Sequence, residues 1–185
     1  MITQPINKYA VGLDLVLNEL SASLKSKLKW LDSAFTLSKT LELEKSGRKY
    51  KYPAAYIGNG EFVSLLPDNS LGNYLFIEKI DPEIVVEKGL HKSITTNIQL
   101  IFWFNLSTIF VETEYNLLEN VKHEIYKHLS SPWILSSSIL KTLKIYTENE
   151  NIFEKYSLQQ VDNQFLMWPY AGIKFECSIK YNVIC

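Results

Sequence analysis

The chain has 185 residues, of which 46% are apolar and 21% are charged, and its formal net charge is −1. This composition is typical of a globular protein that is long enough to bury a core, and we expect one domain spanning residues 1–185. The near-neutral charge argues against a protein that grips nucleic acid over its whole surface, because phosphate binding needs clustered positive charge.

The sequence also argues against a secreted or membrane-spanning chain. No stretch reaches the ~18 apolar residues that a membrane span needs, and the first residues lack the features of a signal peptide. On one strand, Cys177 and Cys185 would lie roughly 26 Å apart, which is beyond the ~7 Å between Cα atoms that a disulfide allows. We expect free thiols in a reducing compartment, with Cys177 as a small buried side chain.

Residues from about 5 to 31 carry apolar side chains at spacings of three and four, which is typical of one helix face. Pro5 suits the first helical position. The small residues 21–23 interrupt the pattern. We therefore expect a first helix from about residue 5 to residue 21, followed by a shorter helical piece that ends near Trp30.

Residues 34–57 alternate apolar and polar side chains on both sides of the turn signal Ser46–Gly47, and this pattern predicts a β-hairpin. Pro53 forbids one ladder hydrogen bond, so it marks an edge or the start of a strand. The local basic patch on this arm is made of Lys45, Arg48, Lys49 and Lys51. The patch is either a solvated hairpin tip or a contact for an acidic partner subunit or for passing DNA.

Residues 58–73 read as a loop, because glycine, asparagine and proline set the backbone there. Its side chains at Phe62, Val63, Leu65 and Leu66 are more apolar than a free loop needs. The loop either folds back on the core or inserts into a neighbouring subunit. A strand at 74–80 and a short strand at 83–87 follow, and this excursion is a candidate projecting arm.

The stretch from Lys92 to Leu106 is the predicted centre of the fold. Apolar side chains occupy every second position, which indicates an extended strand with one buried face. Ile101 and Trp103 then make the second face apolar as well. Burial on both faces predicts a central strand with helices on one face and another element, or another subunit, near its end.

The remaining residues supply further elements. We expect a helix at 113–129, a helical piece at about 132–140, a short strand at 143–147 and an irregular polar segment at 148–171. The clearest alternation of the chain, from Ile173 to Val183, predicts a terminal strand with one face in the core and the other wet or shared.

The sequence lacks the motifs that are typical of catalytic, cofactor-binding and metal-binding sites. The sequence has no glycine-rich phosphate loop, no dinucleotide fingerprint and no zinc-type spacing of cysteine and histidine. His123 and His128 are spaced too far apart to act as two ligands on one helix face, and Ser107 is not flanked by glycines. We expect no catalytic, cofactor-binding or metal-binding residue, although a site assembled from distant residues stays open.

The order of these elements, more than any single residue, points to a family. A helix precedes the proline-led strand Tyr52–Ile57, the long strand Ile94–Asn105 follows, then the helix Glu114–Leu129, and the strand Ile173–Ile184 closes the chain. This pattern resembles the tail terminator proteins of long-tailed bacteriophages, which are also called tail completion or head–tail joining proteins.

The resemblance implies an α+β fold, with helices packed on a mixed, mostly antiparallel β-sheet, a long β-hairpin and a C-terminal strand. It implies a structural virion protein, made in the host cytoplasm, that forms a ring of six copies at the head-proximal end of the tail. The ring ends tail tube polymerisation and joins the tail to the head connector. DNA passes through it without sequence-specific binding, and no cofactor or membrane is involved.

Some apolar side chains lie on segments that are otherwise polar, and we expect them to form the subunit interface of such a ring. They are Tyr50, Tyr52, Phe62, Leu65, Leu66 and Trp103. Two alternatives stay open. One is another phage neck or tail tube subunit. The other is a small intracellular enzyme or ligand-binding domain, which would need a concave pocket with converging polar groups.

Overall fold

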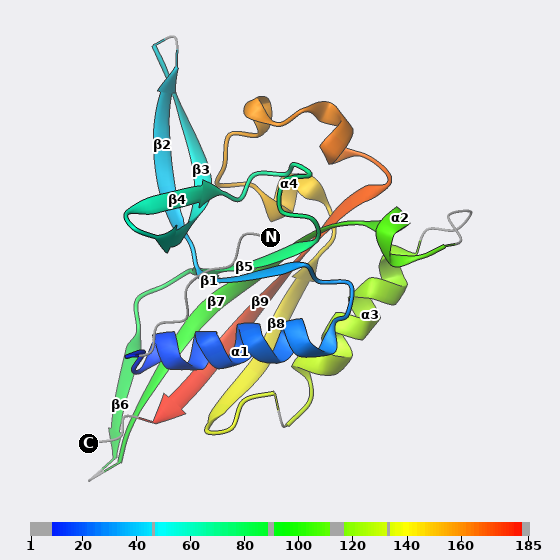
Figure 1. The fold of residues 1–185 in the computed structure, drawn as a ribbon. Helices are drawn as coiled ribbons and strands as arrows, with labels where there is room; N and C mark the ends of the chain where they lie inside the picture. The colour runs from blue at the N-terminus through cyan, green and yellow to red at the C-terminus, as the bar shows by residue number, and fades with distance from the viewer. Residues whose placement is uncertain (1–8, 46, 89–90, 112–116, 133, 183–185) are drawn as a thin grey trace.

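The structure is a computed structural model that describes residues 9–45, 47–88, 91–111, 117–132 and 134–182 (Figure 1). It has an α+β fold, as expected. The strands are β1 (Ser33–Leu37), β2 (Lys39–Lys45), β3 (Arg48–Gly58), β4 (Glu61–Ser64), β5 (Tyr74–Lys79), β6 (Ile84–Lys88), β7 (His91–Asn105), β8 (Ser138–Tyr146) and β9 (Tyr170–Asn182). The α-helices are α1 (Leu13–Lys27), α2 (Leu106–Ile109), α3 (Leu118–Leu129) and α4 (Asn149–Ile152), and two 3₁₀ turns are η1 (Leu158–Gln160) and η2 (Asn163–Leu166).

Strand β7 is the centre of a six-stranded sheet, and the prediction of a central strand is confirmed. The strand order is β1-β5-β7-β9-β8, and β6 also pairs with β7, beyond the end of β5. All pairs in this sheet are antiparallel except β1 with β5, so the sheet is mixed and mostly antiparallel. Strands β2, β3 and β4 form a second, smaller antiparallel sheet.

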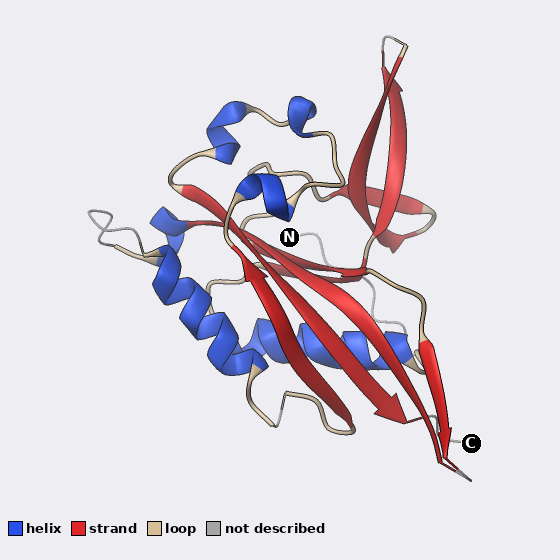
Figure 2. Ribbon diagram, turned by 180° about the vertical axis from the view of Figure 1, so that it is seen from behind, coloured by secondary structure: helices blue, strands red, loops and turns tan. Residues whose placement is uncertain are grey.

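Helices α1 and α3 cover one face of the large sheet. Figure 1 shows both helices in front of the strands, and Figure 2 shows the strands in front of the helices. Alternate side chains of β7 and β9 point into the core between them, where the buried set includes Leu17, Leu20, Leu24, Val121, Ile125, Ile98, Leu100, Phe102, Ile173 and Phe175. This is the face that the period of two predicts for both strands.

Among the described residues, the other face of the sheet is covered only in its upper half. Residues 147–169, which we call the strap, cross that half and include α4, η1 and η2. Ile152 and Phe153 of the strap are buried against Ile101 and Trp103 of β7. The element expected beside these two β7 residues is therefore the chain's own strap.

Helix α1 differs from the prediction at both ends. Residues 9–12 are not helical, and the expected start at Pro5 lies outside the described residues. The helix continues to Lys27 without a break at residues 21–23, so the expected second piece ending near Trp30 is wrong. Ser21 is buried on the sheet side of the helix, where a small side chain lets helix and sheet pack closely.

The predictions of a hairpin at 34–57 and of a helical piece at 132–140 also need correction. The hairpin consists of β2 and β3 alone, because β1 leaves it to pair parallel with β5 and buries Phe35. The helical piece expected at 132–140 is wrong in its described part, since β8 begins at Ser138 and pairs along β9. The bulge between Thr142 and Lys144 shifts the alternation of β8, which hides its period in the sequence.

Smaller differences concern loops and helix ends. Strand β4 forms within the expected loop 58–73 and pairs with β3. The short helix α2 was not predicted; the Asn105 side chain caps it by accepting a hydrogen bond from the Ser107 amide at 2.9 Å. Helix α3 begins at Leu118, and part of the expected 113–129 helix lies outside the described residues.

Replacing Phe175 by alanine tests the core between β9 and the helices. Phe175 is fully buried and packs edge-on against Phe102, with ring centroids 6.0 Å apart. We expect Phe175→Ala to lower the free energy of unfolding by about 3–5 kcal/mol, measured by urea denaturation. The control Tyr126→Ala, on the exposed face of α3, should change it by less than about 0.5 kcal/mol. Equal small losses in both variants would contradict this core.

Candidate interaction surface

Two of the predicted interface residues belong to the chain's own core. Leu65 is 0% exposed and Trp103 is 1% exposed. The Leu65 amide donates to the Pro53 carbonyl at 2.8 Å, and its carbonyl accepts from the Tyr74 hydroxyl at 3.0 Å. Trp103 lies edge-on to Phe153. The loop therefore folds back on the core, and the interface prediction is wrong for these two residues.

The other four predicted interface residues lie on or beside the small sheet. Tyr50 and Tyr52 are half-buried on β3, Leu66 is half-buried after β4, and Phe62 on β4 is exposed. The Phe62 ring centroid lies 5.4 Å from that of Tyr56, on the neighbouring strand. The structure thus brings the predicted residues together on one projecting part of the molecule, except for the two in the core.

The hairpin β2–β3 has one apolar face. Tyr50 pairs with Leu43 and Tyr52 pairs with Leu41, so these four side chains share a face, which we call the hairpin face. Leu43 is 50% exposed. The opposite face is charged, with Lys49 and Lys51 of β3 both within 4 Å of the Glu42 carboxylate on β2. Figure 1 shows the hairpin projecting away from the large sheet.

The strap holds the root of this hairpin. The Ser157 amide donates to the Lys51 carbonyl at 2.9 Å, and the Lys51 amide donates to the Ser157 hydroxyl at 3.1 Å. A pair of reciprocal hydrogen bonds fixes one strand against another segment as a sheet ladder does. The hairpin is therefore attached to the strap as well as to β1.

A row of polar side chains crosses the sheet beneath the strap. Glu78, Gln99, Glu176 and Lys144 are register neighbours on β5, β7, β9 and β8. The Gln99 amide donates to Glu176 at 3.3 Å, and Lys144 lies 3.6 Å from the same carboxylate. Tyr146 also donates to Glu176. This polar row marks the lower limit of the strap-covered half.

Glu78 joins the polar row to the strap. Its carboxylate accepts a hydrogen bond from the Tyr156 hydroxyl and lies 3.6 Å from the Lys155 ammonium, and both partners belong to the strap. Glu78 is almost fully buried. Burial raises the pKa of this carboxyl, and the nearby Lys155 charge only partly offsets the effect.

Lys174 makes a second polar link. Its side chain is buried, and its ammonium donates to the Asn151 carbonyl, pairs with Glu154 at 3.2 Å and lies 4.5 Å from the Tyr146 ring centroid. A buried charge needs such partners, because desolvation without them is costly. The sequence placed Lys174 and Glu176 on a face that was wet or shared, and no sequence signal identified the strap as their cover.

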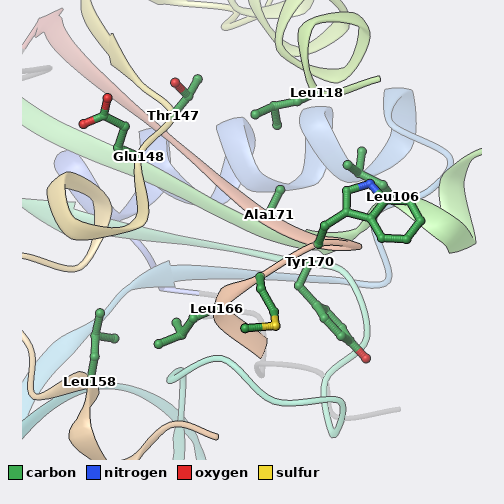
Figure 3. A pocket seen from close by; sticks show the side chains of 10 residues that line it. Leu106, Leu118, Thr147, Glu148, Leu158, Leu166, Tyr170 and Ala171 are labelled. Atoms are coloured by element: carbon green, nitrogen blue, oxygen red, sulfur yellow. The ribbon is translucent and has the colours of Figure 1, made fainter. Parts of the chain in front are cut away.

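A groove of about 780 Å³ opens between the end of the strap and the helices (Figure 3). Trp168 and Met167 are largely exposed at its wall, which is otherwise made of Leu106, Leu118, Thr147, Glu148, Leu158, Leu166, Tyr170 and Ala171. The described lining includes a single carboxylate, that of Glu148, and no histidine, cysteine or lysine. Its chemistry suits an apolar ligand or segment better than acid–base catalysis.

Few other groups qualify as a reactive centre. Within the described ranges, no three histidine, cysteine, aspartate or glutamate side chains gather closely enough to hold a metal ion. Cys177 is a buried free thiol, as predicted, and burial raises its pKa to about 12, which keeps it a thiol at neutral pH. Cys185 lies outside the described residues.

The chain has no match among known protein-family models, and no curated protein sequence matches it. None of the helices that the structure describes is long and apolar enough to cross a membrane.

Replacing Glu78 by glutamine tests the buried carboxyl. A folded-state pKa above the unfolded value means that wild-type stability falls as pH rises from the unfolded value through the folded one. The substituted glutamine cannot ionise, and its side-chain oxygen can still accept from Tyr156. We therefore expect Glu78→Gln to gain stability relative to wild type as the pH rises above about 4, the usual pKa of a carboxyl, measured by urea denaturation from pH 4 to pH 8.

The matched control is Glu44→Gln, on an exposed position of β2. It removes the same charge without burial, so its stability difference from wild type should stay nearly constant over the same pH range. A pH-independent difference for Glu78→Gln would show that burial does not govern this carboxyl.

Proposed function

We propose that the chain is a structural protein of a bacteriophage virion, of the tail-terminator kind. In this proposal it forms a closed ring, a hexamer, at the head-proximal end of the tail, ends tail tube polymerisation and joins the tail to the head connector. The observation that carries the proposal is the projecting hairpin with its apolar hairpin face, on which Leu43 is exposed and Leu41, Tyr50 and Tyr52 are half-buried.

A two-stranded hairpin is only marginally stable alone, and an exposed apolar face on one usually marks a contact site. The hairpin is long, it leaves the body of the molecule, and its apolar residues lie on one side. These features suit an arm that reaches a neighbouring copy. A head-to-tail contact whose rotation closes makes a ring.

The charge distribution supports a passive role toward DNA. The net charge is −1, and two of the hairpin lysines, Lys49 and Lys51, lie beside Glu42. A weakly charged ring lets DNA pass without holding it. The partners in this proposal are the tail tube, the head connector or neck proteins, and further copies of the chain.

We infer a mechanical role and no catalysis. The buried ionisable side chains Glu78 and Lys174 are occupied by partners that fasten the strap to the sheet. Groups held in this way stabilise structure and have little freedom to react with a substrate.

The groove beside Trp168 favours one alternative, a ligand-binding domain. Its volume of about 780 Å³ lies within the usual range of small-molecule pockets, and its walls are mainly apolar. A neck or tail tube subunit remains the other alternative, which a filament in place of a closed ring would favour.

Changing the hairpin face tests the proposal. We expect the double variant Leu43→Ser/Tyr50→Ser to remain folded, because Leu43 is half exposed and the hairpin lies outside the main core. Phages carrying it should accumulate unjoined heads and tails of irregular length, seen by negative-stain microscopy. Loss of the gene should give the same particles.

The control is Thr40→Ser, on the charged face of the hairpin, where joining should be normal. Thermal melts of wild type and both variants separate folding defects from assembly defects. Normal, full-length, head-joined tails in phages that lack the gene would rule out the proposed function.

A further inference from the structure

The large sheet has two unpaired edges in its lower half. Strand β6 forms one edge and β8 forms the other, with β7 and β9 between them (Figure 1). Within the described ranges, neither edge strand makes a backbone hydrogen bond on its outer side. An unpaired edge is a template for another strand.

Apolar side chains are exposed at these edges and not between them. Ile84, Thr95, Lys180 and Ile139 are register neighbours in one row across the sheet, on the face that the strap leaves uncovered. The two central members are polar, whereas Ile84 is 63% exposed and Ile139 is 66% exposed. Further exposed apolar residues continue both edges: Val85 and Val86 on β6, and Leu143 and Ile145 on β8.

The two edges differ in charge, because β8 carries two lysines whereas β6 carries one glutamate and one lysine. Residues 81–88 hold three acidic residues and one lysine, a net charge of −2, and residues 138–146 hold two lysines, a net charge of +2. Glu83 and Glu87 pair with Lys79 and Lys92, and these two lysines balance the net charge of residues 81–88. Contact between unlike edges therefore avoids the repulsion between two basic β8 strands.

We propose that β8 of one copy pairs with β6 of the next copy, so that the sheet continues from subunit to subunit. The inference rests on the proposed ring and names the surface that closes it. Strands β6 and β9 both run antiparallel to β7, and β8 runs antiparallel to β9. A copy that continues the sheet in the same sense therefore joins β8 to β6 in the antiparallel arrangement.

The same features disfavour a two-fold dimer. Pairing β8 with β8 places Lys141 and Lys144 near their own copies, whereas β6, with Glu87 and Lys88, is neutral. Like charges on facing strands are destabilising. Head-to-tail pairing places the basic β8 against the neutral β6, which avoids this repulsion, and buries Ile139 and Ile84 together.

Cross-linking of single-cysteine variants tests the pairing. In a Cys185→Ser background, where the remaining Cys177 is buried, Ile84→Cys and Ile139→Cys are made separately. A short bis-maleimide is then applied to each variant and to their mixture, in purified protein across a concentration series and in assembled particles. We expect a covalent dimer containing one of each variant in the mixture, and several-fold less in either variant alone.

Two controls sharpen the result. Tyr126→Cys, exposed on α3, should not cross-link to Ile139→Cys. Lys141→Glu should lower the mixed cross-link several-fold, while Lys127→Glu on α3 should leave it unchanged. Self-cross-linking of Ile139→Cys as strong as that of the mixture would show two-fold pairing of β8. The absence of any cross-link, in purified protein and in particles, would show that the edges do not contact each other. Either result overturns the proposal.

The outcomes also separate this inference from the proposed function. Mixed cross-links in the purified protein, with no tail defect in phages lacking the gene, would leave the edge pairing correct and the tail role wrong. Rings on tails without any mixed cross-link would leave the tail role correct and the edge pairing wrong.

Discussion

Burial of β7 on both faces is the constraint on which the rest of the structure depends. Its upper half carries Phe102 toward the helices and Trp103 toward the strap, and both are buried. A strand with two apolar faces needs two layers over it. Helices α1 and α3 supply one layer, and the strap supplies the other. The lower half of β7 has polar side chains such as Thr95 and Asn97 on its second face, so it needs no second layer there.

The polar row sets the border between these halves. Glu78, Gln99 and Glu176 face the strap at its lower limit and are tied to it or to one another by hydrogen bonds. Polar groups buried under the strap cost free energy unless they are hydrogen-bonded. The polar row therefore limits how far down the sheet the strap can extend. Among the described residues, the upper half of the sheet is therefore covered on both faces, whereas the strap leaves the second face of the lower half uncovered.

Sequence periodicity predicted the elements whose pattern is continuous, and failed where tertiary contacts interrupt it. Strands β7 and β9 alternate cleanly, so their faces and central place were predictable. The cover over Trp103 was not, because the buried strap residues Ile152, Phe153 and Val161 follow no period. Because the sequence did not reveal which segments cover Leu65 and Trp103, both residues were predicted to lie in an exposed subunit interface. The bulge in β8 hid that strand, and the polar row appeared as a wet face because its partners lie far away in sequence.

The two hydrogen bonds between Lys51 and Ser157 connect the hairpin with the strap, and through the strap with the groove beside Trp168. They attach the hairpin root directly to the strap. The strap also forms much of the wall of the Trp168 groove. One segment of the chain therefore both holds the root of the hairpin and lines the groove.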